Sequence, residues 1–199
     1  GNWTQNPRVV ANGDGWLVSW HFETGAGPVV QVRSVAFAEG GPSFVGPPVD
    51  LSAPGTQQES AAALAWSPTT GEHLVAWAAD GMHLRRLDGS GAPLADAQRI
   101  SPSGTWTEMP SLAHHPGGGC FFLVSMNEQD GSASVRMQRV EDGTGVLLGD
   151  PVELSGPVDF AKVTDVELDA AADEVVVSWF EVRGGVAGFS AQRFRGDGS

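Results

Sequence analysis

Basic residues are scarce in this sequence, and lysine is almost absent. The 199 residues include 24 acidic and 11 basic side chains, a formal charge of −13, and Lys162 is the single lysine. This net charge would repel a polyanion such as DNA or RNA unless a local basic cluster overcame it. The only adjacent basic pair is Arg85 and Arg86. We therefore expect no nucleic-acid partner.

Long apolar runs and a second cysteine are also missing. No stretch approaches 18 consecutive apolar residues, so we expect no membrane insertion. The single Cys120 cannot form a disulfide within the chain, and its apolar setting predicts a buried, unreactive thiol. Because the sequence begins at Gly1 rather than Met, we interpret its start as a result of processing or trimming.

Chain-breaking residues, by contrast, are abundant. The 27 glycines and 13 prolines make up about a fifth of the 199 residues. So many breakers predict short elements with many turns and argue against a helical bundle. With 41% apolar residues, including seven tryptophans and nine phenylalanines, the chain can bury a core and is not expected to be disordered.

The sequence contains a repeat of about 50 residues. Each copy has an apolar run with a similar ending: Trp16–Trp20, His73–Trp77, Phe122–Met126 and Val175–Trp179. A second shared block usually contains Arg-Arg or Gln-Arg: Val32–Val35, Leu84–Leu87, Met137–Val140 and Ala191–Phe194. A tail ending in serine closes three copies, Pro48–Ser52, Ala97–Ser101 and Pro151–Ser155, and the fourth copy lacks it.

Each copy is predicted to form four short β-strands, because its segments are rich in β-branched and aromatic residues and are separated by Gly and Asp turns. Repeated four-stranded units of this length are typical of β-propeller blades, which bury both faces by stacking about an axis. We predict an all-β fold, a β-propeller of about four blades at residues 1–52, 53–101, 102–155 and 156–199, the last blade being incomplete. A β-sandwich is the alternative.

How such a propeller closes stays open. The four blades could close on themselves with an abbreviated last blade. They could instead form half of a larger ring that a second copy completes, or they could be excised from a longer protein. The repeat indicates the blades but does not distinguish among these three arrangements.

The repeat resembles the propeller-like repeats of secreted and surface proteins of high-GC bacteria. The resemblance rests on the strand ending in Val-x-Trp, the strand with paired Arg or Gln-Arg, the Gly-containing turn and the Pro-x-x-Leu-Ser tail. It covers nearly the whole chain, although Met126 replaces the tryptophan in the third copy. The resemblance implies a propeller fold and a secreted or cell-envelope location, and it assigns no catalytic residue.

The loops before the first strand of each copy are the predicted ligand-binding face. Trp3 and Trp106 lie in such loops between polar residues, and an aromatic ring beside amides and carboxylates suits a sugar or a peptide. Packing between blades is the alternative for both rings. The predicted ligand-binding residues are Trp3, Gln5, Gln57, Glu59, Trp106, Glu108, Asp159 and Phe160.

Short catalytic and metal-binding motifs are absent. The sequence contains no Gly-x-Ser-x-Gly, no His-Glu-x-x-His and no P-loop. His114 and His115 are neighbours on a predicted strand, so they point to opposite faces and should not share a metal ion. No catalytic residue, metal or cofactor is predicted. Glu59, Glu108 and Asp159 nevertheless stay open as carboxylates of a glycosidase.

The favoured hypothesis is a non-enzymatic binding or scaffolding propeller of an exported bacterial protein, which recognises a glycan or protein surface through its loop face. An enzyme is less favoured. Two alternatives stay open: a glycoside hydrolase or lyase with carboxylates in the propeller mouth, and a purely structural assembly module. A further hypothesis is a homodimer, in which a second copy of the chain completes a larger ring.

Overall fold

The computed structural model describes residues 4–53, 62–101, 106–129, 131–169 and 171–199, which form four antiparallel sheets. The first contains β1 (Thr4–Ala11), β2 (Gly15–Thr24), β3 (Gly27–Ala38) and β4 (Gly41–Asp50). The second contains β5 (Ala63–Ser67), β6 (Glu72–Ala79), β7 (Gly81–Asp88) and β8 (Gln98–Arg99). The third contains β9 (Trp106–His115), β10 (Cys120–Gln129), β11 (Ser132–Glu141) and β12 (Leu147–Glu153). The fourth contains β13 (Phe160–Asp169), β14 (Glu174–Arg183) and β15 (Val186–Arg195).

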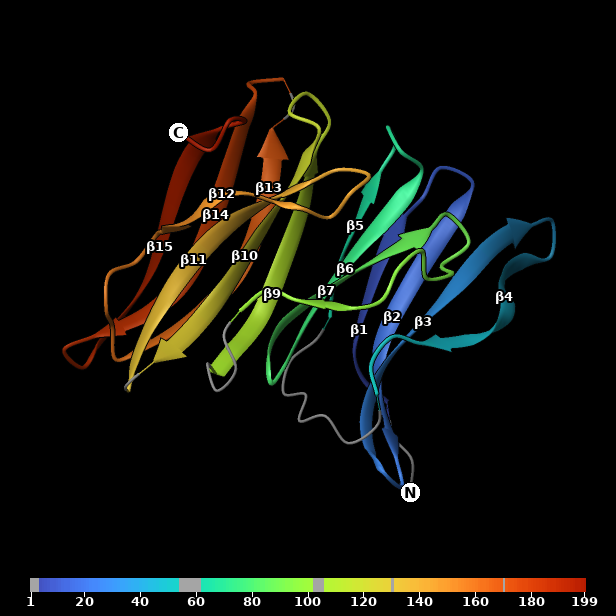
Figure 1. The fold of residues 1–199 in the computed structure, drawn as a ribbon, viewed down its shortest axis with the longest axis horizontal. Coiled ribbons are helices and arrows are strands. Elements are labelled where there is room, and N and C mark those ends of the chain that lie inside the picture. Colours follow the sequence, from blue (N-terminus) through green and yellow to red (C-terminus); the bar gives the residue numbers. More distant parts are fainter. Residues whose placement is uncertain (1–3, 54–61, 102–105, 130, 170) are drawn as a thin grey trace.

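The sheets are arranged as successive blades. Each is a meander of one chain segment whose strands pair in sequence order. Figure 1 shows them side by side as a fan, with the first and fourth sheets at opposite ends. The first strands of the sheets lie innermost, so that β1 packs on β5, β5 on β9 and β9 on β13. This arrangement confirms the predicted β-propeller with an incomplete last blade, and the β-sandwich alternative is wrong.

The apolar core is divided into three clusters, one between each pair of neighbouring sheets. From the first interface to the third, the clusters include Leu17 and Trp77, Leu84 and Leu123, and Met137 and Trp179. Side chains alternate between the two faces of a strand, so a sheet packed on both sides needs apolar residues in both registers. Each such side chain contributes about 1.5–3 kcal/mol through burial.

The repeated tryptophans belong mainly to this core. Trp77 and Trp179 are buried, and so is Met126 at the same repeat position. Trp20 is half-buried, and its indole Nε1 donates to Gln31 Oε1 at 3.1 Å. Cys120 is buried as expected, and this burial raises the pKa of its thiol. Within the described ranges, no helix is long and apolar enough to cross a membrane.

The turn after β7 shows how aspartate and glycine stabilise a hairpin in this chain. In the turn after β7, the Asp88 carboxylate accepts the backbone N–H groups of Ser90 at 2.8 Å and Ala92 at 2.9 Å. Gly91 has a φ of 87°, and a Cβ at this residue would lie 2.8 Å from Leu17 of the first sheet. The turn therefore needs glycine both for its backbone conformation and for the close approach of two blades.

Candidate active site

A large groove runs along the inner strands of the four sheets. We call it the axial groove. It has a volume of about 1070 Å³ and is lined by parts of β1, β5, β9 and β13 and by two residues just beyond them, Pro68 and Pro116. All four blades therefore contribute to a single concave surface, the feature that most often carries a ligand site in a globular protein.

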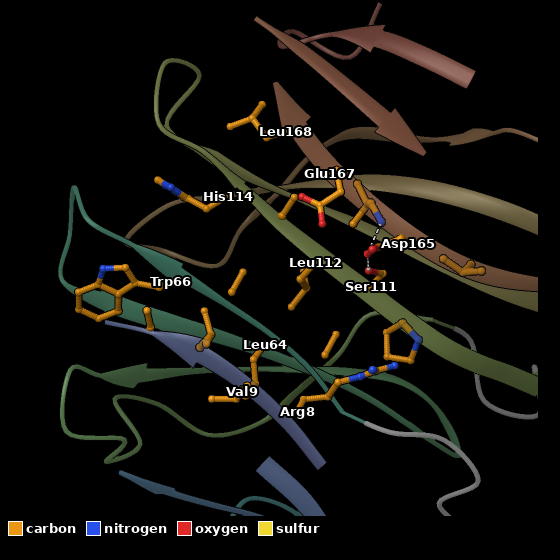
Figure 2. Close-up of a pocket in the computed structure, with 18 of the residues that line it drawn as sticks. Arg8, Val9, Leu64, Trp66, Ser111, Leu112, His114, Asp165, Glu167 and Leu168 are labelled. Carbon is orange, nitrogen blue, oxygen red and sulfur yellow. Dashed lines mark hydrogen bonds between the residues drawn. The ribbon is translucent and has the colours of Figure 1, made fainter. Parts of the chain in front are cut away.

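Two acidic side chains of β13 point into the axial groove. Figure 2 shows Asp165 and Glu167 directed toward its interior, and both are exposed. Residues two apart on a strand lie on the same face, with Cα atoms roughly 6.6 Å apart. The two carboxylates are thus neighbours on one wall of the groove.

A β-bulge determines which β13 side chains reach the groove. The register between β13 and β14 shifts between Val163 and Asp165. Before the bulge the odd-numbered Ala161 and Val163 are buried in the core, whereas after it the even-numbered Val166 is buried. The extra residue exchanges the two faces of the strand, so the odd-numbered acids become exposed.

Asp165 is held in place by hydrogen bonds. Its Oδ1 accepts the Ser111 hydroxyl of β9 at 3.3 Å and the Val166 backbone N–H at 2.9 Å. The first of these bonds crosses from the third blade to the fourth. It fixes the carboxylate at the seam between the two blades, where a groove ligand would meet side chains from both.

Basic and aromatic groups complete the lining. Arg8 enters from β1, on the wall facing Asp165 and Ser111 (Figure 2). Lys162, the single lysine of the chain, lines the groove beside the acids. Trp66 lies toward the other end, and its ring centroid is 4.6 Å from that of His73. The groove therefore combines carboxylates, cations and an aromatic surface.

His114 lines the groove, and its ring is held by a contact with a buried carboxylate. Its Nε2 is 3.0 Å from Asp142 Oδ2. That carboxylate also accepts the hydroxyls of Ser67 at 2.5 Å and Thr70 at 2.9 Å, both from the second blade. Burial raises the pKa of Asp142, but these hydrogen bonds outweigh it, and the pKa lies below its usual value. This buried cluster makes the wall rigid.

The two adjacent histidines behave as their spacing predicts. His114 turns toward Asp142, while His115 turns to the other side and lies 2.6 Å from Asp173 Oδ1. They contact different acids and do not share a partner. Across the parts of the chain that the structure describes, no group of three or more His, Cys, Asp or Glu residues could hold a metal ion.

Of the eight residues predicted from the sequence as ligand contacts, five lie within the described part of the chain and three do not. Trp3, Gln57 and Glu59 are outside the described residues. Gln5 lies in β1 opposite His21, and Trp106 and Glu108 lie in β9 opposite Glu128 and Met126. These three were expected in loops, but the inner strands begin earlier than predicted, because a bulge in β1 and another in β9 accommodate Pro7 and Pro110.

Asp159 and Phe160 are placed at the start of the fourth blade. The Asp159 carboxylate accepts the Gly185 backbone N–H of the β14–β15 hairpin at 3.1 Å. Phe160 is 42% exposed, and its ring meets that of Phe180 edge to face. Neither lines the axial groove as far as the structure describes it. The role of all eight residues in ligand binding stays a prediction.

The chain is similar in fold to solved structures of carbohydrate-cleaving enzymes. An exo-β-1,3-galactanase from Clostridium thermocellum aligns with 97% of this chain at a TM-score of 0.60 and 13% identity. An endo-arabinase from Bacteroides thetaiotaomicron aligns with 94% at 0.56 and 13% identity. An α-L-arabinofuranosidase catalytic domain from Coprinopsis cinerea aligns with 96% at 0.53 and 13% identity.

These neighbours are β-propeller glycoside hydrolases, and the alignments confirm the propeller character of the repeat. The aligned region is 46% of the galactanase chain, 73% of the arabinase and 64% of the arabinofuranosidase domain. This chain therefore spans less than half the length of the galactanase. No protein-family model matches the sequence. A search of curated proteins found no match either.

The comparisons correct the favoured functional hypothesis. A non-enzymatic binding or scaffolding propeller was expected, whereas the solved propellers that this chain resembles are glycoside hydrolases, which favours the enzyme alternative. The expectation was wrong because it took the lack of short catalytic motifs to indicate a binding protein. Glycoside hydrolysis needs two suitably placed carboxylates and no contiguous sequence motif.

Proposed function

We propose that this chain forms the substrate groove of a glycoside hydrolase or lyase that acts on a polysaccharide. The observation that carries the proposal is the pair of acids, Asp165 and Glu167, that point together into a groove shared by four blades. The likeness in fold to galactan- and arabinan-cleaving enzymes supports the same class of substrate.

The two carboxylates suit different roles in hydrolysis. Glycosidases use one carboxyl group as a proton donor to the leaving oxygen and another as a base or nucleophile, separated by about 5–9.5 Å. Asp165 accepts hydrogen bonds from Ser111 and Val166, and these two donors hold its carboxylate in one position. We assign Asp165 as the base or nucleophile and Glu167 as the proton donor.

Other groove residues would bind the sugar chain. An exposed aromatic face stacks on a sugar ring at low entropic cost, the role proposed for Trp66. Arg8 would donate hydrogen bonds to hydroxyl oxygens from the facing wall. Because the groove runs past four blades, it suits an extended polymer better than a single sugar.

The proposal is tested by assaying the purified chain for hydrolysis of galactan, arabinan, xylan and the matching chromogenic glycosides. Glu167→Gln and Asp165→Asn are each expected to lower kcat about 100- to 10,000-fold, because general acid and base groups contribute that much. Glu128→Gln is the matched control, since Glu128 is exposed on β10 and does not line the groove. If no substrate is cleaved, or if all three variants retain activity, the proposal is wrong.

We also propose a secreted or cell-envelope location and an origin in high-GC bacteria. The acidic, lysine-poor composition and the repeat resemblance support both. Completion of a larger ring by a second copy is a further proposal. A solution mass of about 41 kDa, twice the chain mass of 20.7 kDa, would support it.

A further inference from the structure

Two cations of the axial groove have no acidic partner. Arg8 of β1 and Lys162 of β13 line the groove, and both are exposed. Neither forms an ion pair with any residue that the structure describes. Acids outnumber bases by 24 to 11 in this chain, so a cation without a carboxylate partner stands out. Other arginines do pair with carboxylates, namely Arg86, Arg99, Arg136, Arg183 and Arg193.

The bulge of β13 places Lys162 on the same side of the strand as the two groove acids. Lys162 precedes the register shift between Val163 and Asp165, where the even-numbered positions are exposed. Asp165 and Glu167 follow the shift, where the odd-numbered positions are exposed. In a regular strand the lysine and the acids would lie on opposite faces. The fourth blade therefore presents one cation and two carboxylates in a single row along the groove.

Arg8 occupies the equivalent position of the first blade. It pairs with Ser19 of β2, and Asp165 pairs with Ser178 of β14. Both serines directly precede the tryptophan that recurs in the repeat. Equivalent positions of the inner strands surround the axis of a propeller. Figure 2 accordingly shows Arg8 on the wall that faces Asp165. A ligand beside Asp165 therefore meets the guanidinium from the opposite wall.

The two cations are not needed to hold the acids in place. Asp165 is held by Ser111 and Val166, and no ion pair joins either groove acid to a cation within the described ranges. Arg8 and Lys162 are thus available to a ligand. A guanidinium matches a planar carboxylate with two parallel hydrogen bonds, and an ammonium attracts the same group as a point charge.

We propose that the axial groove takes a polysaccharide that contains uronic acid, and that Arg8 and Lys162 bind the carboxylate of a sugar beside the cleaved bond. This inference rests on the proposed function, because it names the substrate class of the same groove. The chain as a whole carries a formal charge of −13 and would repel an acidic polymer. Inside the groove the two cations balance Asp165 and Glu167, so the polymer meets no net repulsion from the lining there.

The test compares uronate oligosaccharides with the same oligosaccharides after reduction of their carboxyl groups to alcohols. The panel contains oligomers of galacturonate, mannuronate and guluronate. Calorimetric titrations use the Glu167→Gln chain, so that cleavage does not consume the ligand. We expect at least one uronate oligomer to bind ten-fold or more tightly than its reduced form at low salt. This preference should shrink as the salt concentration rises, because dissolved ions screen exposed charges.

Protein variants in the same background identify the groups that bind the carboxylate. Arg8→Gln should lower the affinity for the uronate oligomer about ten- to hundred-fold, the loss expected for hydrogen bonds to a charged group. Lys162→Gln should lower it about two- to five-fold, because an exposed point charge contributes less. Arg8→Lys keeps the charge without the paired donors and should bind with intermediate affinity.

Arg193→Gln is the matched control. Arg193 is exposed on β15 and does not line the groove, and its substitution removes the same charge as Arg8→Gln. Its affinity for the uronate oligomer should equal that of the parent chain. Equal losses in Arg8→Gln and Arg193→Gln would instead show attraction by net charge alone and would overturn the proposal.

Other results would also overturn the proposal. One is equal affinity for the uronate and reduced oligomers across the panel. Another is equally tight binding of dextran sulfate, which would make the groove a general site for polyanions. These two comparisons, together with Lys162→Gln, decide the question even if Arg8→Gln fails to fold.

Failure of this proposal can be told apart from failure of the proposed function. If galactan or arabinan is cleaved and no uronate oligomer is preferred, the enzyme proposal stands and the uronate proposal is wrong. If uronate oligomers bind through Arg8 but no polysaccharide is cleaved, the uronate site stands as a binding site and the enzyme proposal is wrong.

Discussion

Two neighbouring histidines of β9 contact acids at the two interfaces of the third blade, and these acids differ greatly in burial. The His114 and Asp142 side chains are 3.0 Å apart and only 6% and 4% exposed, and Asp142 also binds Ser67 and Thr70 of the second blade. The His115 and Asp173 side chains, which link to the fourth blade, are 4% and 70% exposed at 2.6 Å. The shorter contact thus involves the more exposed acid.

The difference shows that distance is a poor guide to energetic weight. The Asp142 carboxylate is buried away from water and contacts three side chains instead. Removing it would leave Ser67, Thr70 and His114 without their hydrogen-bond partner inside the protein. Asp173 remains largely in water, so water can replace it beside His115. Burial, rather than proximity, should decide which interface depends on its acid.

Asp142→Ala is expected to have the largest effect. Breaking a buried hydrogen-bonded charge cluster typically costs about 3–5 kcal/mol of unfolding free energy. The measurement is urea or thermal unfolding of the variant against the original chain. A loss below 1 kcal/mol would mean that the two interfaces do not differ as their burial indicates.

The hydrogen-bonded cluster around Asp142 also makes the stability of the chain depend on pH. The pKa of Asp142 is lowered in the folded chain, so its contribution is present above its unfolded value of 3.8 and is lost as the pH falls through the folded value. The original chain should therefore lose stability more steeply than Asp142→Ala below about pH 4. Parallel slopes for both proteins would contradict this assignment.

His73 extends the comparison of the two histidines, because it is buried but has no carboxylate partner among the described residues. It is fully buried, and neither ring nitrogen has a hydrogen-bond partner within the described residues. Burial lowers its pKa to about 4, partly offset by Asp88. The unfolded chain binds this proton below about pH 6.5, so stability falls by about 3 kcal/mol between pH 6.5 and 4.

His73→Phe should remove this acid sensitivity while keeping the ring contact with Trp66. Unfolding free energies measured at several pH values between 7 and 4 test the prediction. His21, whose pKa is also lowered by burial, remains in both proteins, so the informative quantity is the difference between them. An unchanged pH profile would show that His73 takes up its proton equally readily in the folded and the unfolded chain.

The repeat made much of the fold predictable, because apolar positions such as Trp77 and Trp179 recur wherever two blades must pack. The opposite directions of His114 and His115 also followed from strand geometry. Their partners did not, since Asp142 and Asp173 lie 28 and 58 residues away in turns that only the folded blades bring close.

The acidic pair of the groove was hidden by the bulge in β13. In a regular strand, Asp165 and Glu167 would share a face with the buried Ala161 and Val163, so alternation would place these acids in the core. The register shift between Val163 and Asp165 reverses this. No local signal in the sequence marks the bulge, whereas the prolines at the corresponding places in β1 and β9 could have indicated theirs.

Asp173→Ala is the smallest expected effect and the strictest test of the comparison. Although its contact with His115 is the shorter of the two, the exposed carboxylate should contribute less than about 1 kcal/mol, and water can solvate the freed Nε2. Stability at neutral pH should therefore stay close to that of the original chain in the same unfolding experiment. A loss equal to that of Asp142→Ala would show that the short contact, and not burial, holds the third and fourth blades together.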